Sequence, residues 1–206
     1  NRLYVVDDFR YKKEYLSTAS SNEFPLQVAE NLFVNLEFPK RILEMIASDE
    51  IPLRDRRYRY SCLNFVLLKE MVEQISKMPM DQYLEKEFYG PMGMESTLYN
   101  PLRRFEREQI VPTIQKDYLR NRKELRAAFM GGVSGNAGLF SNARDVAKVY
   151  QMLVDGGQYG GKRYLSLETC QLFMNKKSRI SRRGLGFDKP DSALGKGPCA
   201  DEAPME

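Results

Sequence analysis

Apolar residues recur at helical spacing through the middle of the chain. After Ser61 they follow one another every three or four residues and form one wide arc: Leu63, Phe65, Leu67, Leu68, Met71, Val72 and Ile75. This pattern predicts a helix that begins at Ser61, a residue type suited to the N-cap, and that lies inside a domain.

The same periodicity predicts helices on both sides of this segment. Val28, Ala29, Leu32 and Phe33 share one helical face, Pro39 interrupts, and a second apolar run resumes at residues 42–46. A shorter helix is expected from Met80 to about Phe88, and a helical piece around residues 117–125. The elements before the glycine-rich middle of the chain are therefore expected to be mostly helical.

Glycine becomes dense after residue 130. The segment GGVSGNAG, residues 131–138, favours tight backbone turns packed against a neighbour, although a phosphate-binding loop is the alternative reading. Ser141 or Asn142 is expected to cap a helix that ends at Gly156-Gly157, and Ser166 to cap a shorter one. Residues 159–161 predict a turn, and residues 184–187 the entry to a strand.

The lack of histidine and the small number of cysteines limit the kinds of metal site and catalytic mechanism that the chain can support. It contains no histidine and only three cysteines, Cys62, Cys170 and Cys199, at wide spacing. We therefore predict no metal site and no cofactor, since zinc and iron sites in proteins usually depend on imidazole or on grouped thiolates. Nucleophilic mechanisms whose base is a histidine are excluded for the residues of this chain.

The charge of the chain is mildly positive, at +4, with arginines in short clusters such as Arg54 to Arg59. Nucleic-acid binding through these clusters is an open but disfavoured hypothesis, because backbone tracking usually needs a continuous basic face. The chain shows no run of apolar residues long enough to span a membrane.

Two sequence blocks together resemble a known hydrolase family. The first is Tyr60-Ser61-Cys62 with its apolar helix, followed by Phe-Tyr-Gly-Pro-Met-Gly-Met to residue 94, by Thr97 and by Asn100-Pro101. The second is Gly-Asn-Ala-Gly-Leu-Phe-Ser-Asn-Ala-Arg-Asp, residues 135–145, with Gly156-Gly157 and Gly-Leu-Gly-Phe to residue 187. Over residues 25–188 the chain resembles the penicillin-recognising serine hydrolases, which include β-lactamases and D-alanyl-D-alanine carboxypeptidases.

The resemblance implies an α+β fold, with a helical subdomain packed on an antiparallel sheet and the active site between them. The portion present here would be mainly α-helical. Tyr60 matches the phenol that transfers protons in this family, and Cys62 occupies the position of the usual Asn or Asp on the substrate side. Because a thiol is a weak hydrogen-bond donor, Cys62 departs from the family pattern.

The nucleophile motif of the family is missing from the chain. None of its thirteen serines has a lysine three residues later, and it contains no Lys-Thr-Gly. An unassisted tyrosine is only about 0.1% ionised at pH 7, a deficit of roughly 4 kcal/mol against a base already in its active form. The 206 residues alone are therefore expected to be inactive, and a hydrolase fragment and a degenerate binding or scaffolding domain remain the two readings.

We expect one domain, incomplete at both ends, with an irregular lead-in over residues 1–24, a core over residues 25–187 and a loop tail over residues 188–206. Compared with the family, the sequence looks shortened near residues 124–128, as if a flexible loop had been omitted there. The chain looks most similar to domains joined behind family 3 N-acetylhexosaminidases in exported bacterial proteins. That resemblance implies a small-molecule or peptidoglycan-type substrate, an N-terminal glycosidase domain in the parent, and a periplasmic or envelope location.

Overall fold

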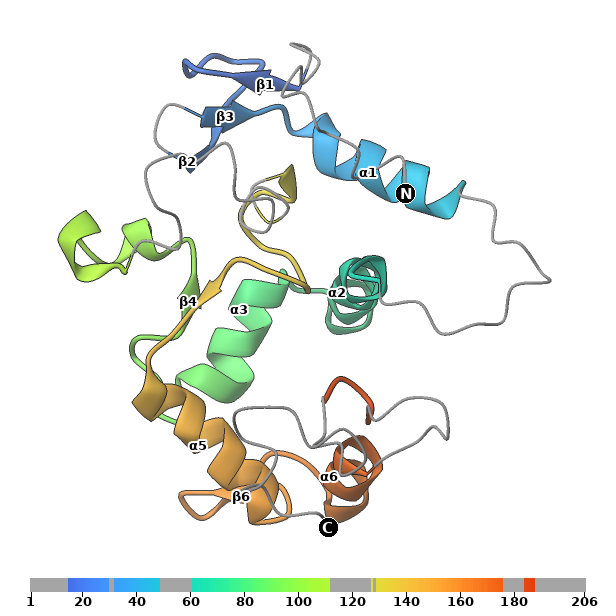
Figure 1. The fold of residues 1–206 in the computed structure, drawn as a ribbon, viewed down its shortest axis with the longest axis vertical. Helices are drawn as coiled ribbons and strands as arrows, with labels where there is room; N and C mark the ends of the chain where they lie inside the picture. The colour runs from blue at the N-terminus through green and yellow to red at the C-terminus, as the bar shows by residue number, and fades with distance from the viewer. Residues whose placement is uncertain are drawn as a thin grey trace, which may run out of the picture. The chain divides into compact units, whose positions relative to one another are not determined.

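The computed structural model describes residues 15–29, 32–48, 61–111, 127, 129–175 and 184–187. The chain divides into two compact units, one formed by residues 1–54 and 61–145 and the other by residues 55–60 and 146–206. Figure 1 shows the helices and strands of each unit. Tyr60, the helical piece expected around residues 117–125, the omitted loop expected near 124–128 and the loop tail from residue 188 lie outside the described residues.

The first unit begins with a small antiparallel sheet. Strands β1 (Leu16–Ser17) and β2 (Leu26–Ala29) both pair with β3 (Leu32–Val34), so that the strand order is β1-β3-β2. Val34, on the central strand, is fully buried. The helix expected over residues 28–33 is wrong, because short apolar stretches fit strand pairing as well as helical spacing. Leu26 and Gln27 pair with Val34 and Phe33.

Helix α1 (Glu37–Ala47) follows the sheet directly. Pro39 lies in its first turn, where the backbone N–H has no partner within the helix, so this proline does not interrupt the helix as expected. Phe38 stacks on Tyr15 at 4.6 Å between ring centroids and meets the edge of the Phe129 ring at 5.2 Å. These three rings join the sheet, α1 and the segment before the glycine-rich turns.

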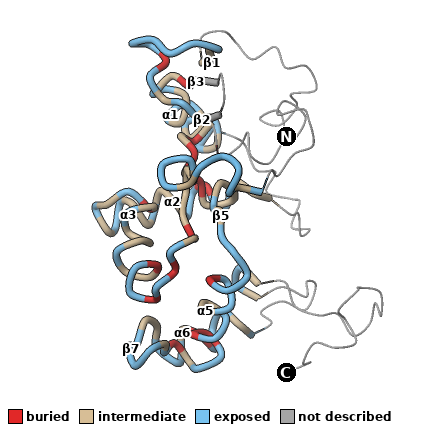
Figure 2. The backbone as a smooth tube through the Cα atoms, turned by 90° about the vertical axis from the view of Figure 1, so that its left-hand side faces the viewer, coloured by how far each residue is buried: buried red, intermediate tan, exposed pale blue. Residues whose placement is uncertain are grey.

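Helix α2 (Leu63–Ser76) leads through a short turn to α3 (Met80–Leu84), which continues as the π-helical turn η2 (Glu85–Tyr89). The expected helix from Met80 to Phe88 is thus confirmed, with a widened last turn. The burial expected for α2 is wrong. Of its residues only Val66 is buried, and its large apolar side chains are between 36% and 80% exposed: Phe65, Leu67, Leu68, Met71 and Ile75. Figure 2 colours the chain by the burial of each residue.

Strand β4 (Leu98–Tyr99) pairs antiparallel with β5 (Leu139–Phe140), and the short 3₁₀ helices η3 (Pro101–Arg103) and η4 (Arg107–Gln109) follow β4. Helix α5 (Ala143–Val154) begins three residues after β5. The Asn142 side chain accepts the N–H of Asp145 at 2.8 Å, so that Asn142, not Ser141, caps α5. At the other end Gly156 and Gly157 donate to Leu153 and Met152, a glycine-terminated helix end as predicted.

The second unit continues with a hairpin of β6 (Gln158–Tyr159) and β7 (Lys162–Arg163) around the expected Gly160-Gly161 turn. Ser166 caps α6 (Leu167–Met174) through a 3.1 Å hydrogen bond from the Thr169 N–H, as predicted. Residues 184–187 form a bend in which the Gly184 N–H donates to the Phe187 carbonyl at 2.9 Å. The strand expected to begin there would continue outside the described residues.

A buried carboxylate connects the two segments of the first unit that carry the sequence resemblance. Asp145 is 3% exposed, and its Oδ2 accepts the backbone N–H of Ser96 at 2.9 Å and the Thr97 hydroxyl at 3.1 Å. Thr97 is also buried, and its Oγ1 lies 2.6 Å from the Ser141 Oγ. These bonds hold the start of α5 against the chain just before β4.

We expect Asp145→Ala to lower the free energy of unfolding by about 2–4 kcal/mol, because it leaves two donors without their acceptor in a buried place. Asp155→Ala is the matched control, since Asp155 is exposed and only accepts from Gln151 one turn away. Urea denaturation of both variants measures the difference. Equal losses in the two variants would contradict a special role for Asp145.

Candidate functional site

The start of α2 is the part of the expected site that the structure describes. Cys62 is the N-cap residue of the helix, with its carbonyl accepting the Phe65 N–H at 3.2 Å. The Ser61 hydroxyl accepts the Leu63 N–H at 3.2 Å. The helix therefore begins one residue later than predicted, although Ser61 still serves the first turn as an acceptor.

The structure describes two residues of the Tyr60-Ser61-Cys62 motif, Ser61 and Cys62. Ser61 has a structural role, since its oxygen is occupied by a backbone donor of α2. Cys62 carries a half-buried thiol at the N-terminal end of the helix. The position of Tyr60 relative to this thiol lies outside the described residues.

The glycine-rich segment packs directly against α2. A side chain at Gly135 would collide with the backbone carbonyl of Phe65, so only glycine permits this close approach. Gly132 has a φ of 83°, and a side chain there would collide with Asn100. These contacts confirm the reading of residues 131–138 as tight turns packed against a neighbour.

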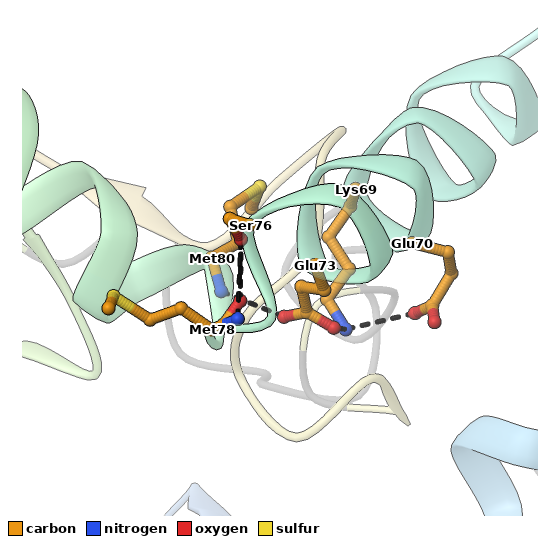
Figure 3. Close-up of polar contacts among 6 residues, drawn as sticks. All are labelled: Lys69, Glu70, Glu73, Ser76, Met78 and Met80. Atoms are coloured by element: carbon orange, nitrogen blue, oxygen red, sulfur yellow. Dashed lines mark hydrogen bonds and ion pairs between the residues drawn. The ribbon is translucent and has the colours of Figure 1, made fainter.

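The C-terminal half of α2 carries a half-buried group of charges that the sequence analysis missed (Figure 3). The ammonium of Lys69 lies 2.7 Å from a Glu73 carboxylate oxygen and 2.9 Å from one of Glu70. The other oxygen of Glu73 accepts the N–H of Met80 at 2.8 Å, at the start of α3. The Lys69-to-Glu73 spacing of four residues was the signal in the sequence for this pair.

The same side chains fix the turn between α2 and α3. Lys77 adopts a left-handed conformation with φ 56°, and the Ser76 hydroxyl binds both the N–H and the carbonyl of Met78. Glu73 then holds the next N–H, that of Met80. The direction in which α3 leaves α2 is thus set by side chains of the last turn of α2.

Lys69 is the lysine of α2 that a hydrolase could use as a base, but its surroundings keep it protonated. Burial lowers the pKa of the Lys69 ammonium, whereas its hydrogen bonds to Glu73 and Glu70 raise that pKa by more, and the net effect is a raised pKa. At neutral pH this lysine is therefore a cation held between two carboxylates, and it cannot accept a proton.

The described residues contain no group of three His, Cys, Asp or Glu side chains arranged to hold a metal ion. A search of the described helices finds none with the length and apolar character that crossing a bilayer requires.

Comparison with known proteins identifies the family. The family model described as Beta-lactamase matches residues 15–190. The chain belongs to the beta-lactamase family. This confirms the predicted family and its α+β fold class, with the part present here mainly helical.

Several curated relatives share one description. A "Putative D-alanyl-D-alanine carboxypeptidase" of Escherichia coli (strain K12) is 33% identical over 164 residues, covering 70% of this chain and 38% of that protein. A protein of the same description from Salmonella typhimurium is 31% identical over 207 residues, covering 91% of this chain and 47% of that protein. The chain thus spans less than half the length of these relatives.

Two solved structures are similar to the chain at low sequence identity. A "putative beta-lactamase from Bacteroides dorei" has a TM-score of 0.49 at 15% identity, covering 82% of this chain and 40% of its own. The D-amino acid amidase from Ochrobactrum anthropi has a TM-score of 0.46 at 16% identity, covering 76% of this chain and 41% of its own.

We expect Glu73→Ala to destabilise the protein by about 1–3 kcal/mol, because it removes both the partner of Lys69 and the acceptor of the Met80 N–H. Glu73→Gln keeps an oxygen for Met80 and should lose less. Glu87→Ala, which removes a more exposed carboxylate paired with Lys86 at 3.4 Å, is the control and should change stability little. Thermal unfolding of the three variants tests this order, and a Glu87→Ala loss as large as that of Glu73→Ala would contradict it.

Proposed function

We propose that the chain is part of a serine hydrolase that acts on peptidoglycan-type or ester substrates through an acyl-serine intermediate. The observation that carries the proposal is the match of most of the chain to the Beta-lactamase family, with relatives described as D-alanyl-D-alanine carboxypeptidases. In this proposal the nucleophilic Ser-x-x-Lys belongs to the longer protein, because none of the thirteen serines here has a lysine three residues later.

Tyr60 is the proposed proton-transfer group, and Cys62 lines the substrate side of the site. The support is the position of Cys62 as the N-cap of α2, so that in the sequence the motif stands directly before this helix. Lys69 cannot take over the role of the missing lysine, since two carboxylates hold it as a cation. The activation of a serine therefore requires a base outside this chain.

The resemblance to domains joined behind family 3 N-acetylhexosaminidases adds two elements to the proposal. The longer protein would carry a glycosidase domain on the N-terminal side, and it would be exported to the periplasm or the cell envelope. The exposed apolar side chains of α2 offer a surface on which further polypeptide, of this chain or of a longer one, could pack.

A catalytically degenerate binding or scaffolding domain is the second candidate. Cys62 favours it, because a thiol cannot replace the hydrogen bonds that an amide or a carboxylate gives to a substrate. In that case the fold would be retained as an accessory to a cell-wall glycosidase, with the cleft binding substrate but not cleaving it.

The first test is intact-mass spectrometry before and after reaction with a fluorophosphonate that modifies activated serines. We expect one adduct on the longer natural protein and none on the 206-residue chain, since the chain lacks a serine with its lysine. An adduct on the 206-residue chain would contradict the assignment of the nucleophile. Absence of an adduct on the longer protein would favour the degenerate binding domain.

The role of Tyr60 is tested by Tyr60→Phe in the longer protein. We expect kcat for a chromogenic ester to fall by about 10²- to 10⁴-fold with little change in KM, because the ring remains and only the proton-transfer group is lost. Tyr58→Phe removes the neighbouring phenol two residues upstream and should leave kcat unchanged. Equal rates for the two variants would rule out Tyr60 as the proton-transfer residue.

A further inference from the structure

The first unit contains an open hollow of about 410 Å³ that the proposed function does not use. It is formed by α3, η2, β4 and η3, and its lining includes two carboxylates, two tyrosines and two arginines: Asp81, Glu85, Tyr89, Tyr99, Arg103 and Arg104. Its volume lies within the range of small-molecule sites in proteins.

The sequence places these side chains together for simple geometric reasons. Asp81, Glu85 and Tyr89 follow one another every four residues, so they lie on one face of the continuous helical segment α3-η2. The opposite wall comes from β4 and η3, which contribute Tyr99 and Arg103. The N–H of Gly90 reaches the carbonyl of Glu85 at 2.9 Å, a π-type bond, and such wide turns occur often at functional sites.

Two tyrosines give the hollow a partly apolar lining. Tyr89 is 8% exposed, and burial raises its pKa well above the ordinary range. Burial also raises the pKa of Tyr99 to about 12. Both phenols are therefore neutral at physiological pH and can donate as well as accept. The Tyr99 hydroxyl donates to the Ser134 carbonyl at 3.3 Å, whereas within the described part of the chain no partner is found for the Tyr89 hydroxyl.

Two pairs of opposite charges line the hollow, and the two members of each pair lie slightly beyond hydrogen-bond distance. Arg103 lies 3.9 Å from Asp81, and Arg104 lies 3.6 Å from Glu85. Both distances exceed a hydrogen bond, so the carboxylate oxygens and guanidinium nitrogens can still bind a ligand. Another nitrogen of Arg104 donates to the Glu95 carbonyl at 3.0 Å, which holds its guanidinium in place.

We propose that this hollow binds a neutral sugar. A sugar hydroxyl both donates and accepts, so one ring can bind carboxylates and guanidiniums at the same time. The lining mixes two carboxylates with three cations, Arg103, Arg104 and Lys86, so it does not present a single sign of charge to an ionic ligand. Leu98, Tyr89 and Tyr99 add apolar atoms to the lining, against which the C–H groups of a sugar ring can pack. This inference is independent of the proposed hydrolase activity, and either can fail without the other.

The test is an NMR titration of the chain labelled with ¹³C at the tyrosine rings, with N,N′-diacetylchitobiose, maltose and cellobiose as probes. Tyr89→Phe and Tyr99→Phe assign the two resonances. We expect at least one of the disaccharides to shift both. The double variant Asp81→Asn with Glu85→Gln should weaken that binding by about tenfold or more, because it removes charged acceptors while keeping side-chain shape.

The matched control is the double variant Glu37→Gln with Glu44→Gln, which removes two carboxylates of α1 that pair with Lys40 and Arg41. It should bind the sugar as the unmodified chain does. Thermal midpoints show whether each variant is folded. Lack of a shift with all three disaccharides at roughly 50 mM would overturn the proposal. So would a larger response to inorganic phosphate, or unchanged sugar binding in a folded Asp81→Asn, Glu85→Gln variant.

Discussion

The buried carboxylate of Asp145 is the interaction on which the arrangement of the first unit depends. It accepts hydrogen bonds from Ser96 and Thr97, which lie almost fifty residues earlier in the chain. The two sequence blocks that carry the family resemblance are therefore not separate signatures. Thr97 of the first block and Asp145 of the second meet in one hydrogen-bonded junction, and the pairing of β4 with β5 begins next to it.

This junction also explains the glycines of residues 131–138. Once β5 is paired with β4, the chain before it must pass close to α2 and Asn100, and side chains at Gly132 and Gly135 would collide there. The glycines thus serve the approach of backbone to backbone. A phosphate-binding role is not needed to account for them. The start of α2, with Cys62, is in turn backed by this segment.

The sequence predicted best those features that are decided locally. Helix ends at Asn142, Ser166 and Gly156 depend on side chains and glycines within a few residues, and each was predicted, with Asn142 as one of two candidates. The hairpin of β2 and β3 was mistaken for a helix, because a short apolar run has no period of its own until a partner strand is known. The hollow at α3 was missed because Tyr99 and Arg103 come from another segment.

The exposure of α2 was mispredicted for a different reason. An apolar arc on a helix predicts a surface that favours burial, but it does not show which polypeptide covers that surface. In α2 only Val66 is buried. The one lysine that α2 presents is committed to Glu70 and Glu73, and Glu73 is committed to Met80. Lys69 and Glu73 therefore belong to the connection between α2 and α3.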